Sequence, residues 1–179
     1  ERTSALIRRA LIFFGDRAEP TLPALLDRFA SCLEATGFSG YVWIIGKSMD
    51  QYGAQANDIL RAQLGHAMDR TTHKVMSLLA AAPAPDAISD VLDDYLHSCL
   101  VTIQTAPALL FGSASFSHSY AIAIQALCAL SPSLVGIATD VVRAIVEYAR
   151  EAPAPDRTLV QTIRMVVGER GSDTVRTIL

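Results

Sequence analysis

The chain has 179 residues, of which 51% are hydrophobic and 18% are charged, and its formal net charge is −3. This composition is too apolar for a disordered chain, and it lacks the basic excess of a nucleic-acid-binding protein. No apolar run approaches the roughly 20 residues of a membrane-spanning helix, and diffuse charge gives no reason to expect a membrane partner. The three cysteines are odd in number and form no CxxC pair, so we predict a reducing compartment without a disulfide framework.

The first two expected helices have clear stop signals. One runs over about 3–14 and ends at Gly15. The second begins near Thr21 with Pro23 in its first turn, and Gly37 supplies the left-handed residue that commonly ends a helix.

Two longer segments follow. Apolar residues at helical spacing predict a third helix from Phe38 to Tyr52, which Gly53 ends. Because a glycine inside a helix costs about 1 kcal/mol relative to alanine, Gly46 predicts the close approach of a crossing helix. An unusually long fourth helix is expected over about 55–81.

The clearest amphipathic pattern comes after Asp86. It predicts a fifth helix that Asp86 or Ser89 caps by accepting backbone N–H bonds and that Pro107 ends. Spacings of three and four place one apolar stripe toward a core, and its members are Ile88, Val91, Leu92, Tyr95, Leu96, Cys99, Leu100 and Ile103.

Helical signals continue to the end of the chain. A sixth helix is expected over about 115–130, and a seventh opens with Ser131 as its cap and Pro132 at its first position. An eighth is expected over about 157–169, and Ser172 is expected to cap a truncated ninth, so that the array continues beyond the sequence given.

Paired in order, the helices form hairpins over about 1–37, 38–82, 86–130 and 131–171, with a further helix starting at 172–179. This spacing is close to the roughly 40–47 residues of HEAT and armadillo repeats. A single hairpin cannot bury its apolar stripes, so neighbouring hairpins stack. We therefore expect one all-α array, a HEAT/armadillo-like superhelix of about four hairpins. A compact helical bundle is the alternative fold, because the fourth helix is unusually long.

Two motifs that follow one another along the chain resemble those of a known family. An aromatic helix with an internal glycine ends in an acidic-x-Tyr-Gly turn, in the runs Gly40-Tyr41-Val42-Trp43-Ile44-Ile45-Gly46-Lys47 and Asp50-Gln51-Tyr52-Gly53. An Asp-rich helix that ends before a proline follows, from Asp90-Val91-Leu92-Asp93-Asp94-Tyr95-Leu96 to Ala106-Pro107-Ala108-Leu109-Leu110. The order and spacing resemble the middle-to-late repeats of the importin-β superfamily (karyopherins), nearest to its transportin-SR and importin-thirteen branch.

The resemblance implies a piece of a nuclear transport receptor that shuttles between nucleus and cytoplasm. Such a receptor holds protein cargo on a HEAT-repeat superhelix, and the Ran GTPase would bind parts of the protein outside this sequence. Nucleoporins are further candidate partners. We expect no enzyme activity, cofactor, metal, direct nucleic-acid contact or membrane contact. A generic HEAT scaffold in another assembly, and a helical enzyme or metal protein, stay open as alternatives.

One departure from the family concerns its cargo. In transportin-SR, the helix that matches the fifth helix resembles a comb of arginines for phosphorylated Arg-Ser segments. The matching positions here are His97, Val101 and Thr105. Since a spaced row of arginines is needed to bind successive phosphates, phosphoserine recognition through this helix is in doubt.

Charged residues on the fourth helix are the predicted partner-binding residues. His66, Asp69, Arg70 and His73 share one helix face, where two imidazoles and a carboxylate could ligate zinc. Arg70 inside the set disfavours a cation, and a solvated helix face explains the same spacing. In the resembling family, second helices of hairpins line the concave side. We therefore predict contact with acidic cargo through Arg61, His66, Arg70, His73 and Lys74.

Three aspartates and a tryptophan have two interpretations each. Asp90, Asp93 and Asp94 lie in the first turns of the fifth helix, where the helix dipole favours carboxylates, and contact with a basic cargo is the alternative. Trp43 lies off the apolar stripe of its helix. We expect it to pack on a neighbouring hairpin, with an aromatic stacking platform as the alternative.

A catalytic serine is not expected. The segment 112–115, followed by His118, has neither the GxSxG nor the GxxxxGK[ST] pattern, and no strand precedes it. We predict no serine–histidine–acid set.

Overall fold

The computed structural model describes residues 20–151 and 157–178, with side chains up to Gly168. This part of the chain is all-α and contains no strand. Its helices are α2 (Leu22–Thr36), α3 (Ser39–Tyr52), α4 (Asp58–Ala81), α5 (Ser89–Thr105), α6 (Pro107–Phe111), α7 (Phe116–Ala126), α8 (Pro132–Glu151) and α9 (Arg157–Ile178), with a 3₁₀ turn over Pro85–Ile88. The helix expected over 3–14 lies outside the described residues.

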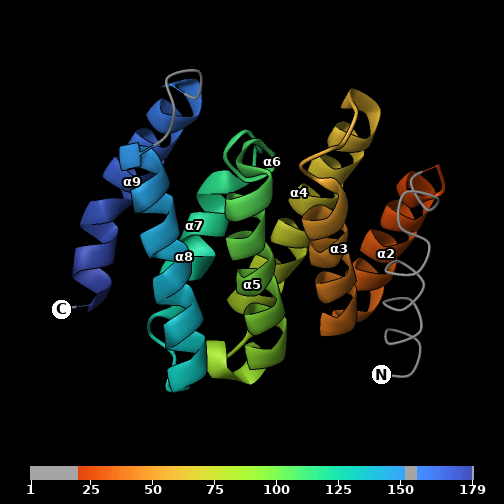
Figure 1. Cartoon of the computed structure of the whole chain (residues 1–179). Helices are drawn as coiled ribbons and strands as arrows, with labels where there is room; N and C mark the ends of the chain where they lie inside the picture. Colours follow the sequence, from red (N-terminus) through yellow and green to blue (C-terminus); the bar gives the residue numbers. More distant parts are fainter. Residues whose placement is uncertain (1–19, 152–156, 179) are drawn as a thin grey trace.

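The helices lie in two layers (Figure 1). One layer holds α3, α5 and α8 side by side, and the other holds α2, α4, α7 and α9. The chain runs in one direction along α3, α5 and α8 and returns along α4, α7 and α9, so successive long helices are antiparallel. The apolar stripes of both layers therefore face a shared interior.

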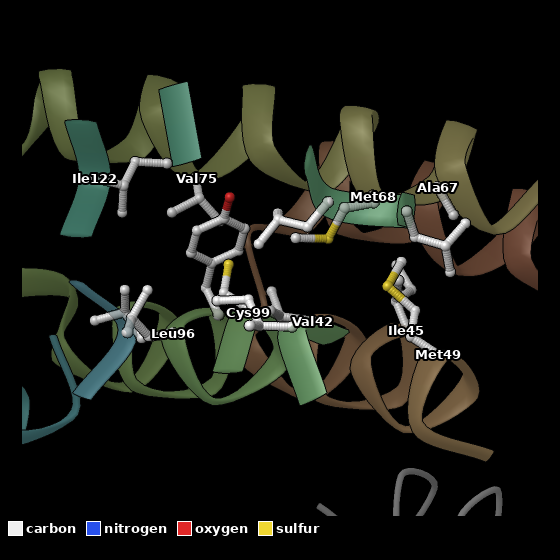
Figure 2. Close-up of a cluster of buried hydrophobic side chains, with 14 of the residues drawn as sticks. Val42, Ile45, Met49, Ala67, Met68, Val75, Leu96, Cys99 and Ile122 are labelled. Carbon is white, nitrogen blue, oxygen red and sulfur yellow. The ribbon is translucent and has the colours of Figure 1, made fainter. Parts of the chain in front are cut away.

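The interior is mainly apolar, and several hydroxyls are buried in it, three of which form one group. Side chains from α3, α4, α5 and α7 point toward one another between the layers (Figure 2). Near the centre, Tyr95 of α5 is fully buried, and its hydroxyl donates to Ser119 Oγ at 2.8 Å. Thr72 Oγ1 lies 2.9 Å from the same hydroxyl. The three side chains connect α4, α5 and α7 through groups that would be costly to leave unpaired.

Two glycine predictions agree with the structure. Gly37 has φ 66° and ends α2, with its N–H donating to the carbonyl of Leu33. Gly46 lies where α3 meets α5, and a Cβ built on it would be 1.9 Å from Ser98 Oγ. The absence of a side chain at Gly46 therefore lets the two helices approach closely.

The predicted start of α4 and the predicted cap of α5 are wrong. α4 begins at Asp58 rather than near residue 55, because the Asn57 side chain accepts the N–H of Leu60 at 2.9 Å. No side chain caps α5, which follows a 3₁₀ turn.

Asp86 has a longer-range role instead of capping α5. Its carboxylate accepts the backbone N–H groups of Leu130 at 2.8 Å and Ser131 at 2.9 Å. These hydrogen bonds hold the pKa of Asp86 below its usual value, and the bond from Leu130 has the largest effect. The carboxylate thus satisfies donors at the start of α8 and ties that helix to the turn before α5.

Three further boundaries differ from the prediction. The sixth expected helix, over 115–130, is shorter as α7, because the residues after Ala126 make turn-type bonds to carbonyls three residues earlier. A short helix, α6, precedes it, since Pro107 both ends α5 and occupies the first position of α6. The break expected at Ser172 is absent, and α9 continues to Ile178. No proline follows Ser172, so every backbone N–H there stays able to donate and the helix can continue.

The close approach of α3 and α5 predicts opposite effects for two glycine substitutions. Gly46→Ala should destabilise the fold by about 1–3 kcal/mol, because the added Cβ overlaps Ser98. Gly65→Ala is the matched control, since a Cβ there meets nothing within 4 Å, and it should stabilise the fold by up to about 1 kcal/mol. Denaturant unfolding measures both, and equal effects of the two substitutions would contradict the close contact.

Candidate functional site

Two adjoining hollows lie on the layer formed by α3, α5 and α8. One, of about 310 Å³, lies between α3 and α5 and is lined by Trp43, Gly46, Lys47, Asp50, Asp93, Asp94, His97, Ser98 and Val101. The other, of about 510 Å³, extends toward α8 and is lined by Ser39, Ser89, Asp90, Asp93, Asp94, Ser131, Ser133 and Leu134. Because Asp93 and Asp94 line both hollows, we treat the two together as one acidic groove.

The periodicity of α5 places one face of the helix, which is mostly polar, in this groove. Residues 90, 93, 94, 97, 98 and 101 recur at helical spacing, so they share one face of the helix. The opposite face carries Val91, Leu92, Tyr95, Leu96 and Cys99, all of which are buried. Burial of that stripe fixes the rotation of α5, and the aspartates are turned outward as a consequence.

Negative charge exceeds positive charge in the groove. Lys47 Nζ pairs with Asp50 Oδ2 at 2.7 Å, and His97 Nδ1 lies 3.4 Å from Asp93 Oδ2. Among the described residues, no Lys or Arg forms an ion pair with Asp90 or Asp94. Two carboxylates are therefore left without a cationic partner.

Asp94 is the most perturbed of these groups. Its pKa is raised to about 6, chiefly because the carboxylate is half-buried and in smaller part because Asp93 and Asp90 lie nearby. A hydrogen bond from Ser39 and the proximity of His97 act in the opposite direction. The carboxylate is thus held where its charge is poorly solvated.

Of the predicted partner-binding residues, Arg70 is engaged within the protein. Its Nε and Nη2 donate to the two carboxylate oxygens of Glu34 at 2.7 and 2.6 Å. Nη1 donates to Asp27 Oδ1 at 2.7 Å and Nη2 also to Ser31 Oγ at 2.9 Å. The Arg70 side chain is only 18% exposed. These bonds raise the pKa of Arg70 and lower that of Glu34, so Arg70 fastens α4 to α2.

Two of the other predicted residues of α4 lie with Arg70 around Glu34, and the remaining two lie elsewhere. His66 and Lys74 lie near Glu34 on the α2 side, with His66 exposed. Arg61 donates to the carbonyl of Ala56 at 3.1 Å and lies 3.8 Å from Asp58. His73 is exposed, and its Nδ1 lies 2.8 Å from the carbonyl of Asp69.

Asp69 belongs to a polar cluster that the sequence does not reveal. Its Oδ1 accepts the hydroxyls of Ser113 and Ser115, and the N–H of Ser115 approaches the same oxygen at 3.4 Å. The His73 and His118 rings lie beside each other, with centroids 5.5 Å apart. Both serine hydroxyls donate to the carboxylate, so the cluster braces the turn before α7. Over the residues described, no three His, Cys, Asp or Glu side chains are placed to hold a metal ion.

Comparison with known proteins returns nothing. No family model, curated protein or solved structure matches the chain. In addition, none of the described helices combines the length and the apolar character needed to cross a membrane. Function must therefore be inferred from the groove and from the residues themselves.

The sequence identified some of the groove and missed the rest. Asp90, Asp93, Asp94 and Trp43 were candidate contact residues, and His97 and Val101 were compared with the arginine comb. Lys47 and Asp50 were not identified, although both lie on α3 one turn beyond Trp43 and Gly46. The signal that could have found them is Gly46, because it marks where α5 approaches α3.

The Arg70 contacts predict a stability defect. Arg70→Lys should cost about 1 kcal/mol, because a single ammonium cannot bond Glu34 through two parallel N–H groups while also reaching Asp27. Arg143→Lys, at an exposed pair with Asp140, is the control and should change stability by less than about 0.5 kcal/mol. Urea unfolding of both variants compares them directly, and equal losses would refute a special role for Arg70.

The raised pKa of Asp94 predicts a pH-dependent gain. Its folded-state pKa of about 6 exceeds the usual aspartate pKa of about 4, so the charged carboxylate destabilises the fold increasingly as the pH rises from about 4 to 6. Asp94→Asn should therefore raise the Tm at pH 7.5 and leave it nearly unchanged at pH 4. A Tm gain that is equally large at both values would show that charge is not the cause.

Proposed function

We propose that this chain is part of a nuclear transport receptor that binds protein cargo on stacked helical hairpins. Two layers of antiparallel helices, with like-directed helices side by side, support a HEAT-type superhelix over a compact bundle. The proposal includes no catalytic role and no cofactor. It places the protein in both nucleus and cytoplasm, with Ran contacting other parts of the protein.

The position of the acidic groove is the observation that carries this proposal. His97 and Val101 match two positions of the arginine comb in the resembling family, and both line the groove. Thr105, the third matching position, does not line it. The face of α5 that corresponds to the arginine comb is thus hollowed here, and the hollow carries Trp43 and several carboxylates. A hollow with an aromatic side chain and charged side chains is well suited to hold part of a protein partner.

The same argument moves the proposed contact surface from α4 to α3, α5 and α8. Arg70 is occupied by Glu34, Asp27 and Ser31, so it has little capacity left for an acidic cargo. His66 and His73 remain exposed candidates on α4.

Binding to Ran in its two nucleotide states tests the proposal. The full-length protein is immobilised with proteins captured from a cell extract, and Ran loaded with GTP or with GDP is then added. Ran-GTP should bind and release the captured proteins, whereas Ran-GDP should leave them in place. Equal behaviour of the two forms would contradict a transport receptor and favour a HEAT scaffold in another assembly.

A further inference from the structure

Two histidines from different helices lie beside each other, away from the acidic groove. His73 belongs to α4 and His118 to α7, and the centres of their rings are 5.5 Å apart. Two imidazoles that bind one tetrahedral metal ion through bonds of about 2.0–2.1 Å have ring centres about 5 Å apart. The separation of the two rings is therefore close to that of a pair of metal ligands.

His73 is already oriented as a metal ligand would be. Its Nδ1 lies 2.8 Å from the backbone carbonyl of Asp69, and because a carbonyl only accepts, Nδ1 carries the proton. In the neutral ring Nε2 then has a free lone pair, and the exposed position of His73 gives an ion access to it. Metal-binding histidines commonly donate their other ring N–H to a carbonyl in this way.

His118 has a ring nitrogen that the protein leaves unpaired. Its Nδ1 is buried, and no group in the described part of the chain forms a hydrogen bond with it. Most buried polar side-chain atoms have a partner, and a bound ion is one reason for an exception. An ion held between the two rings would give Nδ1 of His118 a partner, and the exposed ring of His73 can turn to admit it.

The charges around the pair suit a cation. Arg70 and Lys74, the basic residues nearest to His73 along α4, lie near Glu34 of α2. On the side of α7, the Asp69 carboxylate accepts two hydroxyls from the turn before that helix. The basic side chains are therefore drawn to the α2 side of α4, and a carboxylate lies on the α7 side.

We propose that His73 and His118 together bind one divalent transition-metal ion that favours imidazole, such as Zn²⁺, Cu²⁺ or Ni²⁺, with water in the remaining coordination positions. Two protein ligands agree with the lack of a three-ligand cluster among the described residues. The ion joins α4 to α7 and so stabilises the fold. Mg²⁺ and Ca²⁺, which take oxygen ligands, do not replace it. The proposal is independent of the transport function, because it concerns neither cargo nor Ran.

Titration of the 179-residue chain with Zn²⁺ tests the proposal. Calorimetry at pH 7.5 should show one ion per chain, and Zn²⁺ should raise the Tm in a way that EDTA reverses and Mg²⁺ does not reproduce. His73→Ala and His118→Ala should each weaken Zn²⁺ binding by at least about tenfold. Absence of binding, or an unchanged affinity in His73→Ala, would overturn the proposal. His73 is exposed, so this variant is decisive even if His118→Ala impairs folding.

Two control variants separate the histidine pair from other zinc ligands. His97→Ala is the matched control, because Nδ1 of His97 also lies near a carbonyl four residues earlier, at 3.0 Å, but no second imidazole lies beside it within the described ranges. Cys128→Ser removes an exposed thiol. Both substitutions should change the affinity by less than about twofold. A greater loss in either control than in His73→Ala would show that the ion binds elsewhere, and it would refute the proposed site.

Discussion

The close contact of α3 with α5 is the constraint on which the other features depend. At Gly46 the backbone of α3 comes so near Ser98 that no side chain fits between them. This contact brings Trp43, Lys47 and Asp50 of α3 opposite the aspartates of α5. With a larger residue at position 46 the helices would separate, and two exposed helix faces would replace one groove.

The orientation of α5 is fixed from its buried side. Tyr95 inserts between the layers, and its hydroxyl shares hydrogen bonds with Thr72 of α4 and Ser119 of α7. A rotation of α5 would leave these hydroxyls unpaired in an apolar interior, which is costly. The outward direction of Asp90, Asp93 and Asp94 thus follows from interactions on the opposite side of the helix.

Features set by local chemistry could be predicted from the sequence, and features set by distant partners could not. Gly37 and Pro107 end their helices through backbone constraints that any chain would feel. The Arg70 contacts join residues 36 and 43 positions apart, and Asp86 bonds donors 44 and 45 positions away. A charged residue in a helix pattern does not tell which neighbouring helix will bring its partner.

The same distinction explains the candidate site. Helical spacing groups Asp90, Asp93 and Asp94 on one face, but it does not tell whether that face is open to solvent or forms the wall of a hollow. Half-burial of Asp94 comes from its packed surroundings, and its raised pKa records the resulting loss of hydration. A carboxylate that only served the helix dipole at an exposed first turn would not carry this cost.

The two faces of α5 are under different constraints, and this difference bears on specificity. Its buried stripe and Ser98 must fit the neighbouring helices, whereas its outward-facing aspartates need only be compatible with solvent and a partner. Charge on the groove face can therefore change sign without disturbing the packing of the layers. An arginine row and an aspartate row are equally compatible with such a helix, so the partner's charge is set by residues that the fold itself does not require.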